Sequence, residues 1–193
     1  MPLEIIKRRK DIVMFNIKGR LGLFFLLLAC CVVSLNCGYT VKSALPSGYR
    51  SIYVEPFKNS INFTSEGGRR LYMPLLEVKI RDAIVNRFLF DGNLKVAGRY
   101  NSDLILSGEL KGYNRSVLRY TDDEDAEEYR VSIIVSLRLM DAETGKVVWE
   151  EPSFAGEADY FVSGAFAESE DTAIDNAVVD LARRVVERTI ENW

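Results

Sequence analysis

The chain has 193 residues, of which 48% are hydrophobic and 27% are charged, and this composition suits one folded domain behind a leader. Histidine is absent, which excludes histidine base catalysis, Ser-His-Asp and Cys-His constellations, and imidazole metal ligands. Residues 1–36 carry a net charge of +4, whereas the remaining 157 residues carry −7. So acidic a body argues against nucleic-acid binding, which depends on neutralising phosphates.

The chain opens with a basic segment and an uncharged run, LGLFFLLLACCVVSL (21–35). About fifteen residues is short of the roughly 20 that a membrane-spanning helix needs. A basic segment followed by a short apolar run is typical of a secretory signal peptide, which we predict for 1–36. An uncleaved signal anchor is the alternative, because the basic segment is long and contains Asp11.

All three cysteines lie near the end of this run, at positions 30, 31 and 37. A cysteine in this place predicts a lipoprotein signal, in which the thiol is diacylated and becomes the mature N-terminus. The sequence SLNC ending at Cys37 uses the whole apolar run, and LLAC ending at Cys30 is the alternative. We predict lipid attachment at Cys37, followed by a lipidated tether over 37–50.

The first strand is predicted at SIYVEPF (51–57), with Ile52, Val54 and Pro56 on one face. A helix is predicted from about Pro74, and Gly92 is well placed to cap its end. Its expected buried face consists of Leu76, Ile80, Ala83, Ile84, Arg87 and Phe88.

Two long alternating segments predict strands over 103–113 and 129–141, and KVVWEE (146–151) predicts a fourth strand after a turn. One face of each long strand is apolar. The expected core-facing residues are Leu104, Leu106, Gly108, Leu110, Val131, Ile133, Val135, Leu137 and Leu139. The other face is mixed and polar, with Ser132, Ser136 and Arg138. This pattern is typical of an antiparallel sheet covered on one side.

The last helix is predicted from the N-cap Ser169 to about Ile190. Its apolar stripe consists of Ile174, Ala177, Val178, Leu181, Val185 and Val186. The order strand-helix-strand-strand-strand-helix predicts one α+β domain over 51–193. We expect a two-layer sandwich, with two helices packed on one face of a four-stranded, mostly antiparallel sheet.

Charged residues gather around TDDEDAEEY (121–129), which holds six acids in seven residues. An oxygen-rich metal site and a solvated hairpin tip are both conceivable, and the absence of the spaced D-x-D-x-D-G pattern favours the hairpin tip. Arg115, Arg119 and Arg130 flank this segment. They are candidates for bidentate binding of phosphate or carboxylate, or they balance the acidic tip across the strands.

No catalytic constellation emerges from the sequence. Asp103 and Glu109 share a strand face but stand about 20 Å apart along the strand, too far to share a substrate. Neither a phosphate-binding glycine loop nor a nucleophile elbow is present. We therefore predict that the protein is not an enzyme and has neither a catalytic nor a metal site.

Several motifs in order resemble the LptE family of lipopolysaccharide-assembly lipoproteins. They are Cys-Gly-Tyr (37–39), SIYVEPFKN (51–59), SDLILSGELKGY (102–113), SVLRY (116–120) and the block 127–151, followed by an aromatic-rich strand and an amphipathic helix. The resemblance spans nearly the whole mature chain. It favours Cys37, because the family's lipidated cysteine directly precedes a Gly-aromatic pair.

The resemblance implies a non-enzymatic lipoprotein on the periplasmic side of the outer membrane. Such a protein plugs and helps assemble the β-barrel subunit (LptD-like) of the lipopolysaccharide translocon and binds lipopolysaccharide during insertion. It needs no cofactor beyond its covalent lipid. The resemblance places a lipopolysaccharide contact at Arg119, whereas a second expected basic position holds Glu168. The alternative is a lipoprotein activator or assembly factor of another envelope machine, such as a peptidoglycan synthase or a secretion channel.

Overall fold

Three long antiparallel strands make up most of the sheet. The computed structural model describes residues 48–61 and 75–191. The long strands are β4 (Leu104–Tyr120), β5 (Ala126–Asp141) and β6 (Val147–Phe161). Three short strands complete the sheet: β1 (Ser51–Val54), β2 (Lys58–Asn59) and β3 (Lys95–Val96). The order is β3-β1-β4-β5-β6, and β2 also pairs with β4.

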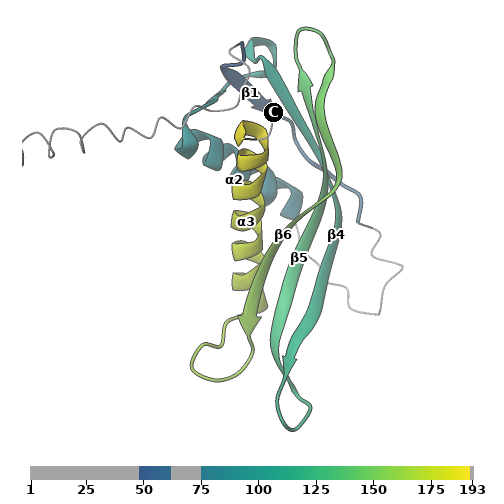
Figure 1. The fold of residues 1–193 in the computed structure, drawn as a ribbon, viewed down its shortest axis with the longest axis vertical. Coiled ribbons are helices and arrows are strands. Elements are labelled where there is room, and N and C mark those ends of the chain that lie inside the picture. Colours follow the sequence, from purple (N-terminus) through teal and green to yellow (C-terminus); the bar gives the residue numbers. More distant parts are fainter. Residues whose placement is uncertain (1–47, 62–74, 192–193) are drawn as a thin grey trace, which may run out of the picture. The chain divides into compact units, whose positions relative to one another are not determined.

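Both long helices cover the same face of this sheet (Figure 1). They are α2 (Leu76–Asp91) and α3 (Glu170–Glu191), and a short 3-10 helix, η1, spans Arg99–Asn101. Within the described residues, neither long helix combines the length and the apolar character needed to cross a membrane. The predicted α+β class, with two helices on one face of a sheet, is confirmed.

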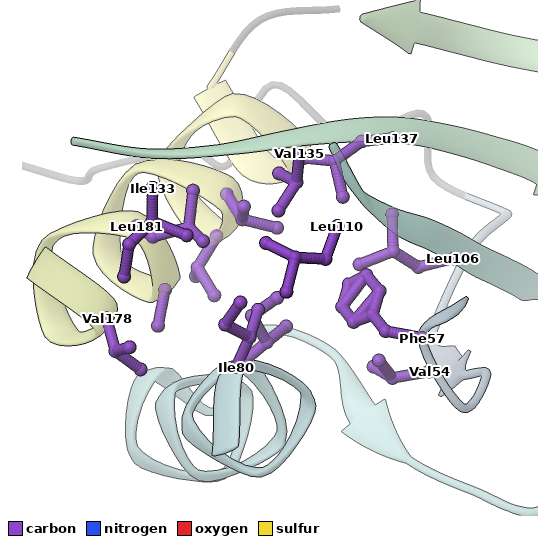
Figure 2. Close-up of a cluster of buried hydrophobic side chains, with 14 of the residues drawn as sticks. Val54, Phe57, Ile80, Leu106, Leu110, Ile133, Val135, Leu137, Val178 and Leu181 are labelled. Atoms are coloured by element: carbon purple, nitrogen blue, oxygen red, sulfur yellow. The ribbon is translucent and has the colours of Figure 1, made fainter. Parts of the chain in front are cut away.

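The core lies between the sheet and the two helices (Figure 2). The apolar faces predicted for the two long strands and for α3 are buried there, as expected from their periods of two and 3.6 residues. Gly92 caps α2 in the left-handed conformation, and its N–H donates to Phe88 O. Ser169 Oγ accepts the N–H of Thr172 at 3.1 Å, which confirms it as the N-cap of α3.

Three predictions about the sheet need correction. Pro56 is exposed and Phe57 is buried instead, because Phe57 fills the space left by the missing side chain of Gly108. The fourth strand continues from Val147 to Phe161, well beyond residue 151, because it pairs with β5 along nearly its whole length. The sheet also has six strands, and the three short ones pair in parallel with their neighbours.

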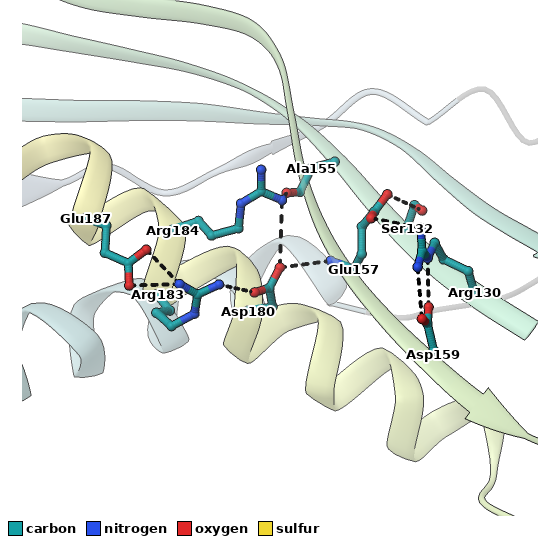
Figure 3. Close-up of polar contacts among 9 residues, drawn as sticks. All are labelled: Arg130, Ser132, Ala155, Glu157, Asp159, Asp180, Arg183, Arg184 and Glu187. Carbon is teal, nitrogen blue, oxygen red and sulfur yellow. Dashed lines mark hydrogen bonds and ion pairs between the residues drawn. The ribbon is translucent and has the colours of Figure 1, made fainter. Parts of the chain in front are cut away.

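Helix α3 lies unusually close to β6 at Gly156. A Cβ at this position would lie 2.4 Å from Leu181 Cβ and 2.5 Å from Ala177 O. Beside this contact, Arg184 donates to Ala155 O at 2.5 Å, and Asp180 Oδ2 accepts the N–H of Glu157 at 3.2 Å (Figure 3). Side chains of α3 therefore form hydrogen bonds with backbone groups on the side of β6 that faces away from β5.

Several predictions fall outside the described residues. They concern the signal peptide at 1–36, the cysteines Cys30 and Cys37, most of the tether at 37–50, and the helix start at Pro74.

Candidate functional site

The face of the sheet opposite the helices, here called the outer face, is mostly polar. No helix of the described residues packs on it. Strand register places its side chains in rows across β4, β5 and β6. The rows are Ser107–Arg138–Glu150, Asn114–Ser132–Glu157, Ser116–Arg130–Asp159 and Arg119–Glu128–Phe161. The mixed polar face predicted for β5 is therefore confirmed.

Arg130 sits at the centre of the most highly connected row. Its Nε and one terminal nitrogen donate to the two carboxylate oxygens of Asp159 at 2.7 and 2.9 Å, and Glu157 lies 3.6 Å away (Figure 3). The hydrogen bond from Arg130 lowers the pKa of Asp159. Ser132 in turn donates to Glu157 at 3.1 Å. Arg130 is thus held by two carboxylates of its own sheet.

A depression of about 300 Å³ lies farther along the outer face, near the start of β4. Most of its lining side chains are polar or charged. They come from the β1–β2 segment and from β4, β5 and β6: Glu55, Lys58, Ser107, Glu109, Ser136, Arg138 and Glu150. Arg138 is paired with Glu150 at 2.7 Å. This part of the face is suited to hydration and offers little apolar contact.

Arg119 is the most exposed of the three predicted arginines, with 59% of its side chain accessible. Its guanidinium lies 3.3 Å from Glu128 and 5.6 Å from the centre of the Phe161 ring. Glu168 is close by, because its N–H donates to Phe161 O at 2.8 Å. The acidic residue at the second expected position therefore lies beside the strand end that Arg119 contacts.

Arg115 faces the helices and not the outer face. Its guanidinium donates to Glu170 Oε2 at 2.5 Å and lies 4.4 Å from the centre of the Tyr129 ring. Tyr113 donates to the other oxygen of Glu170 at 2.7 Å. Burial and this hydrogen bond raise the pKa of Tyr113. The structure thus separates Arg115 from Arg119 and Arg130, although the three are close in sequence.

The acidic segment forms the exposed turn between β4 and β5. Thr121 N–H donates to Asp125 O at 2.8 Å, and the side chains of Asp122, Asp123 and Glu124 are exposed. Across residues 48–61 and 75–191, no group of three cysteine, aspartate or glutamate side chains is placed to hold a metal ion. The turn geometry confirms a hairpin tip over 121–125, whereas residues 126–129 already belong to β5.

Sequence reasoning missed the cluster that Arg115, Tyr113 and Glu170 form with Tyr160. Tyr160 comes from the part of β6 beyond residue 151, which periodicity did not predict and which the family resemblance implied only as an aromatic-rich strand. It stacks on Tyr129 with ring centres 5.8 Å apart. The alternation of Gly156, Ala158 and Tyr160 with the charged Glu157 and Asp159 is the signal that could have extended the strand.

The model of the LptE family, described as lipopolysaccharide-assembly, matches residues 49–189. Among curated proteins, none matches the chain significantly. Solved structures similar to this chain include the hypothetical protein CT253 from Chlamydia trachomatis, which is 13% identical with a TM-score of 0.48 over 73% of this chain and 95% of that chain. PelC from Paraburkholderia phytofirmans is 15% identical, with a TM-score of 0.46 over 77% and 95% of the two chains. Rare lipoprotein B from Shewanella oneidensis is 15% identical, with a TM-score of 0.39 over 68% and 88%.

Proposed function

The chain belongs to the LptE family of lipopolysaccharide-assembly proteins, and we propose on this basis that it is a non-enzymatic outer-membrane lipoprotein, anchored through Cys37 or alternatively Cys30. It plugs the β-barrel subunit of the lipopolysaccharide translocon from the periplasmic side. It also helps that barrel to assemble and assists insertion of lipopolysaccharide into the outer leaflet.

The observation that carries this proposal is the polar outer face. The interiors of large outer-membrane barrels are polar, so a plug must present a hydrated surface to the barrel wall. The rows across β4, β5 and β6 supply such a surface, because arginines and carboxylates alternate and are paired with each other. The apolar side chains that these strands bury, such as Leu106, Val135 and Leu139, lie on the helix side instead.

A co-purification experiment tests the proposal. The full chain, carrying a C-terminal tag, is extracted from outer membranes with mild detergent, and its partners are identified by mass spectrometry. We expect a large outer-membrane barrel in stoichiometric amount, and a lipid-modified N-terminus at Cys37. Recovery of a peptidoglycan synthase or a secretion channel without such a barrel would favour the alternative function. A Cys37→Ala chain that still carries lipid would contradict the anchor.

Arg119 is the best placed of the three arginines to contact lipopolysaccharide. It is more exposed than the others and has one carboxylate partner, whereas Arg130 is held by Asp159 and Arg115 is turned toward α3. An exposed guanidinium suits the phosphates of lipopolysaccharide.

We expect Arg119→Glu to weaken binding to purified lipopolysaccharide by about tenfold, the value of one charged hydrogen bond. Arg138→Glu is the matched control, since Arg138 lies on the same face, is similarly exposed and is paired with Glu150. Binding is measured by surface plasmon resonance on immobilised lipopolysaccharide. Equal affinities for both variants would remove Arg119 from the contact site.

A further inference from the structure

The two sides of β4 are paired very differently. On one side, β5 pairs with β4 from Leu104 to Tyr120. On the other side, β1 and β2 pair only as far as Leu110, whose carbonyl also accepts the N–H of Ser60. In the part of the chain that the structure describes, no strand pairs with this side of β4 from Lys111 to Tyr120. These ten residues extend over about 33 Å.

The strand register shows which backbone groups point to this open side. The backbone C=O of Ala155 and the backbone N–H of Glu157 bond to side chains of α3, so the backbone groups of these two residues point away from β5. The backbone N–H and C=O of Gly156, which lies between them, therefore point toward its β5 partner Ile133. The backbone groups of Ile133 then point toward β6 and away from β4. The backbone groups of its β4 partner Tyr113 therefore point away from β5. The backbone N–H and C=O of Tyr113 are thus directed to the open side.

Alternation gives the same direction to Arg115 and Val117, before the register shift that follows Val117. Three alternate residues, Tyr113, Arg115 and Val117, therefore present backbone donors and acceptors along one edge. This is the arrangement that accepts an added strand.

The opposite edge of the sheet, on β6, is protected. Arg184 and Asp180 occupy backbone groups of β6, and Glu168 N–H donates to Phe161 O at 2.8 Å. Pro152 lies at a register shift in the same strand. Prolines, irregular registers and covering groups are devices by which proteins prevent strand addition. The open stretch of β4 contains no proline, and no described residue covers its edge in this way.

The open stretch contains no acidic residue. Two of its basic side chains, Lys111 and Arg119, are 43% and 59% exposed, and each has only a surface carboxylate partner, Glu109 and Glu128. Arg115 does not contribute, because it faces α3 and bonds to Glu170. Exposed pairs of this kind are weak, so an extended segment with acidic side chains would complement Lys111 and Arg119. We propose that the open edge of β4, Lys111–Tyr120, pairs with an extended, acid-bearing segment of the barrel subunit. The inference rests on the proposed function for the identity of the partner, and it adds the surface and the mode of contact.

Site-specific photo-cross-linking in cells tests this inference in the full, lipid-anchored chain. A photoreactive amino acid replaces Lys111 or Leu118 on the open edge, or Val147 on the protected strand, all of which are exposed. We expect cross-links to the barrel subunit from the two β4 positions and none from Val147. Mass spectrometry of the cross-linked peptide should identify a segment rich in aspartate or glutamate.

A proline variant tests the backbone pairing itself. Val117→Pro removes an N–H that points to the open side, whereas Val117→Ala keeps it and is the control. Loss of one such hydrogen bond should lower the cross-linking yield from Lys111 about three- to tenfold. Thermal unfolding of both variants shows whether the fold is kept. If Val117→Pro does not fold, the cross-links from the chain that keeps Val117 still test the inference.

Three outcomes would overturn the inference. If the barrel co-purifies but cross-links only from Val147 or from the outer face, the proposed function stands and the edge contact is wrong. If the β4 positions cross-link to residues 62–74 of the same chain, the protein closes its own edge. If no barrel co-purifies, the proposed function fails and this inference fails with it.

Discussion

Replacing Gly156 with alanine should destabilise the domain by about 3 kcal/mol, the upper part of the range for overpacked cores. The added Cβ would meet Leu181 Cβ at 2.4 Å, Ala177 O at 2.5 Å and Leu181 N at 2.7 Å. Two of these three atoms belong to the α3 backbone, so no side-chain rotation can relieve the clash. Helix α3 would have to move away from the sheet, and it carries a large share of the core.

Urea unfolding of the purified protein, followed by circular dichroism, measures this change. Gly112→Ala is the matched control, because Gly112 also lies within a long strand but its added Cβ would meet only Ile134, at 3.7 Å or more. We expect that control to change the free energy of unfolding by less than about 1 kcal/mol, because alanine also reduces the conformational entropy of the unfolded chain. Equal effects at both glycines would show that the close approach of α3 does not limit stability.

Replacing Glu170 with alanine should cost about 2 kcal/mol, because it leaves several partly buried polar groups without their acceptor. Arg115 lies 2.5 Å from one carboxylate oxygen, and Tyr113 donates to the other at 2.7 Å. The side chains of Arg115 and Glu170 are each only 24% exposed, so water replaces the lost contact poorly.

Asp175→Ala provides the control on the same helix. Asp175 pairs with Lys79, but these side chains are 56% and 51% exposed, and such surface pairs contribute less than about 1 kcal/mol. Glu170→Gln separates the charge from the hydrogen bonds, since glutamine still offers one oxygen acceptor. A loss at Glu170→Ala no larger than that at Asp175→Ala would mean that the cluster is already hydrated.

The Glu170 result also bears on the role of Arg115. If Arg115 serves to hold the end of β4 against α3, then Arg115→Ala should lower the stability of the domain, whereas Arg119→Ala should leave it nearly unchanged. This difference follows from their surroundings, because Arg119 is largely exposed. The three arginines then have distinct tasks, although they were predicted as one group.

The sequence by itself determined the parts of the fold that depend on local period. The buried residues of β5 and the apolar stripe of α3 follow from spacings of two and 3.6 residues, and both caps follow from residue type. The acidic turn and the polar outer face were predictable for the same reason. Family membership was also predictable, since it rests on the order of short motifs that are visible in the sequence.

Only the tertiary structure decided where the arginines point and how α3 meets the sheet. Strict alternation counted from Leu104 would place Arg115 on the outer face, but register shifts after Leu110 and after Val117 turn Arg115 toward the helices and Arg119 away from them. An extra residue in a strand is a property of the pairing between two strands, so no local pattern reveals it. The need for glycine at position 156 likewise arises from a helix that begins fourteen residues later in the chain.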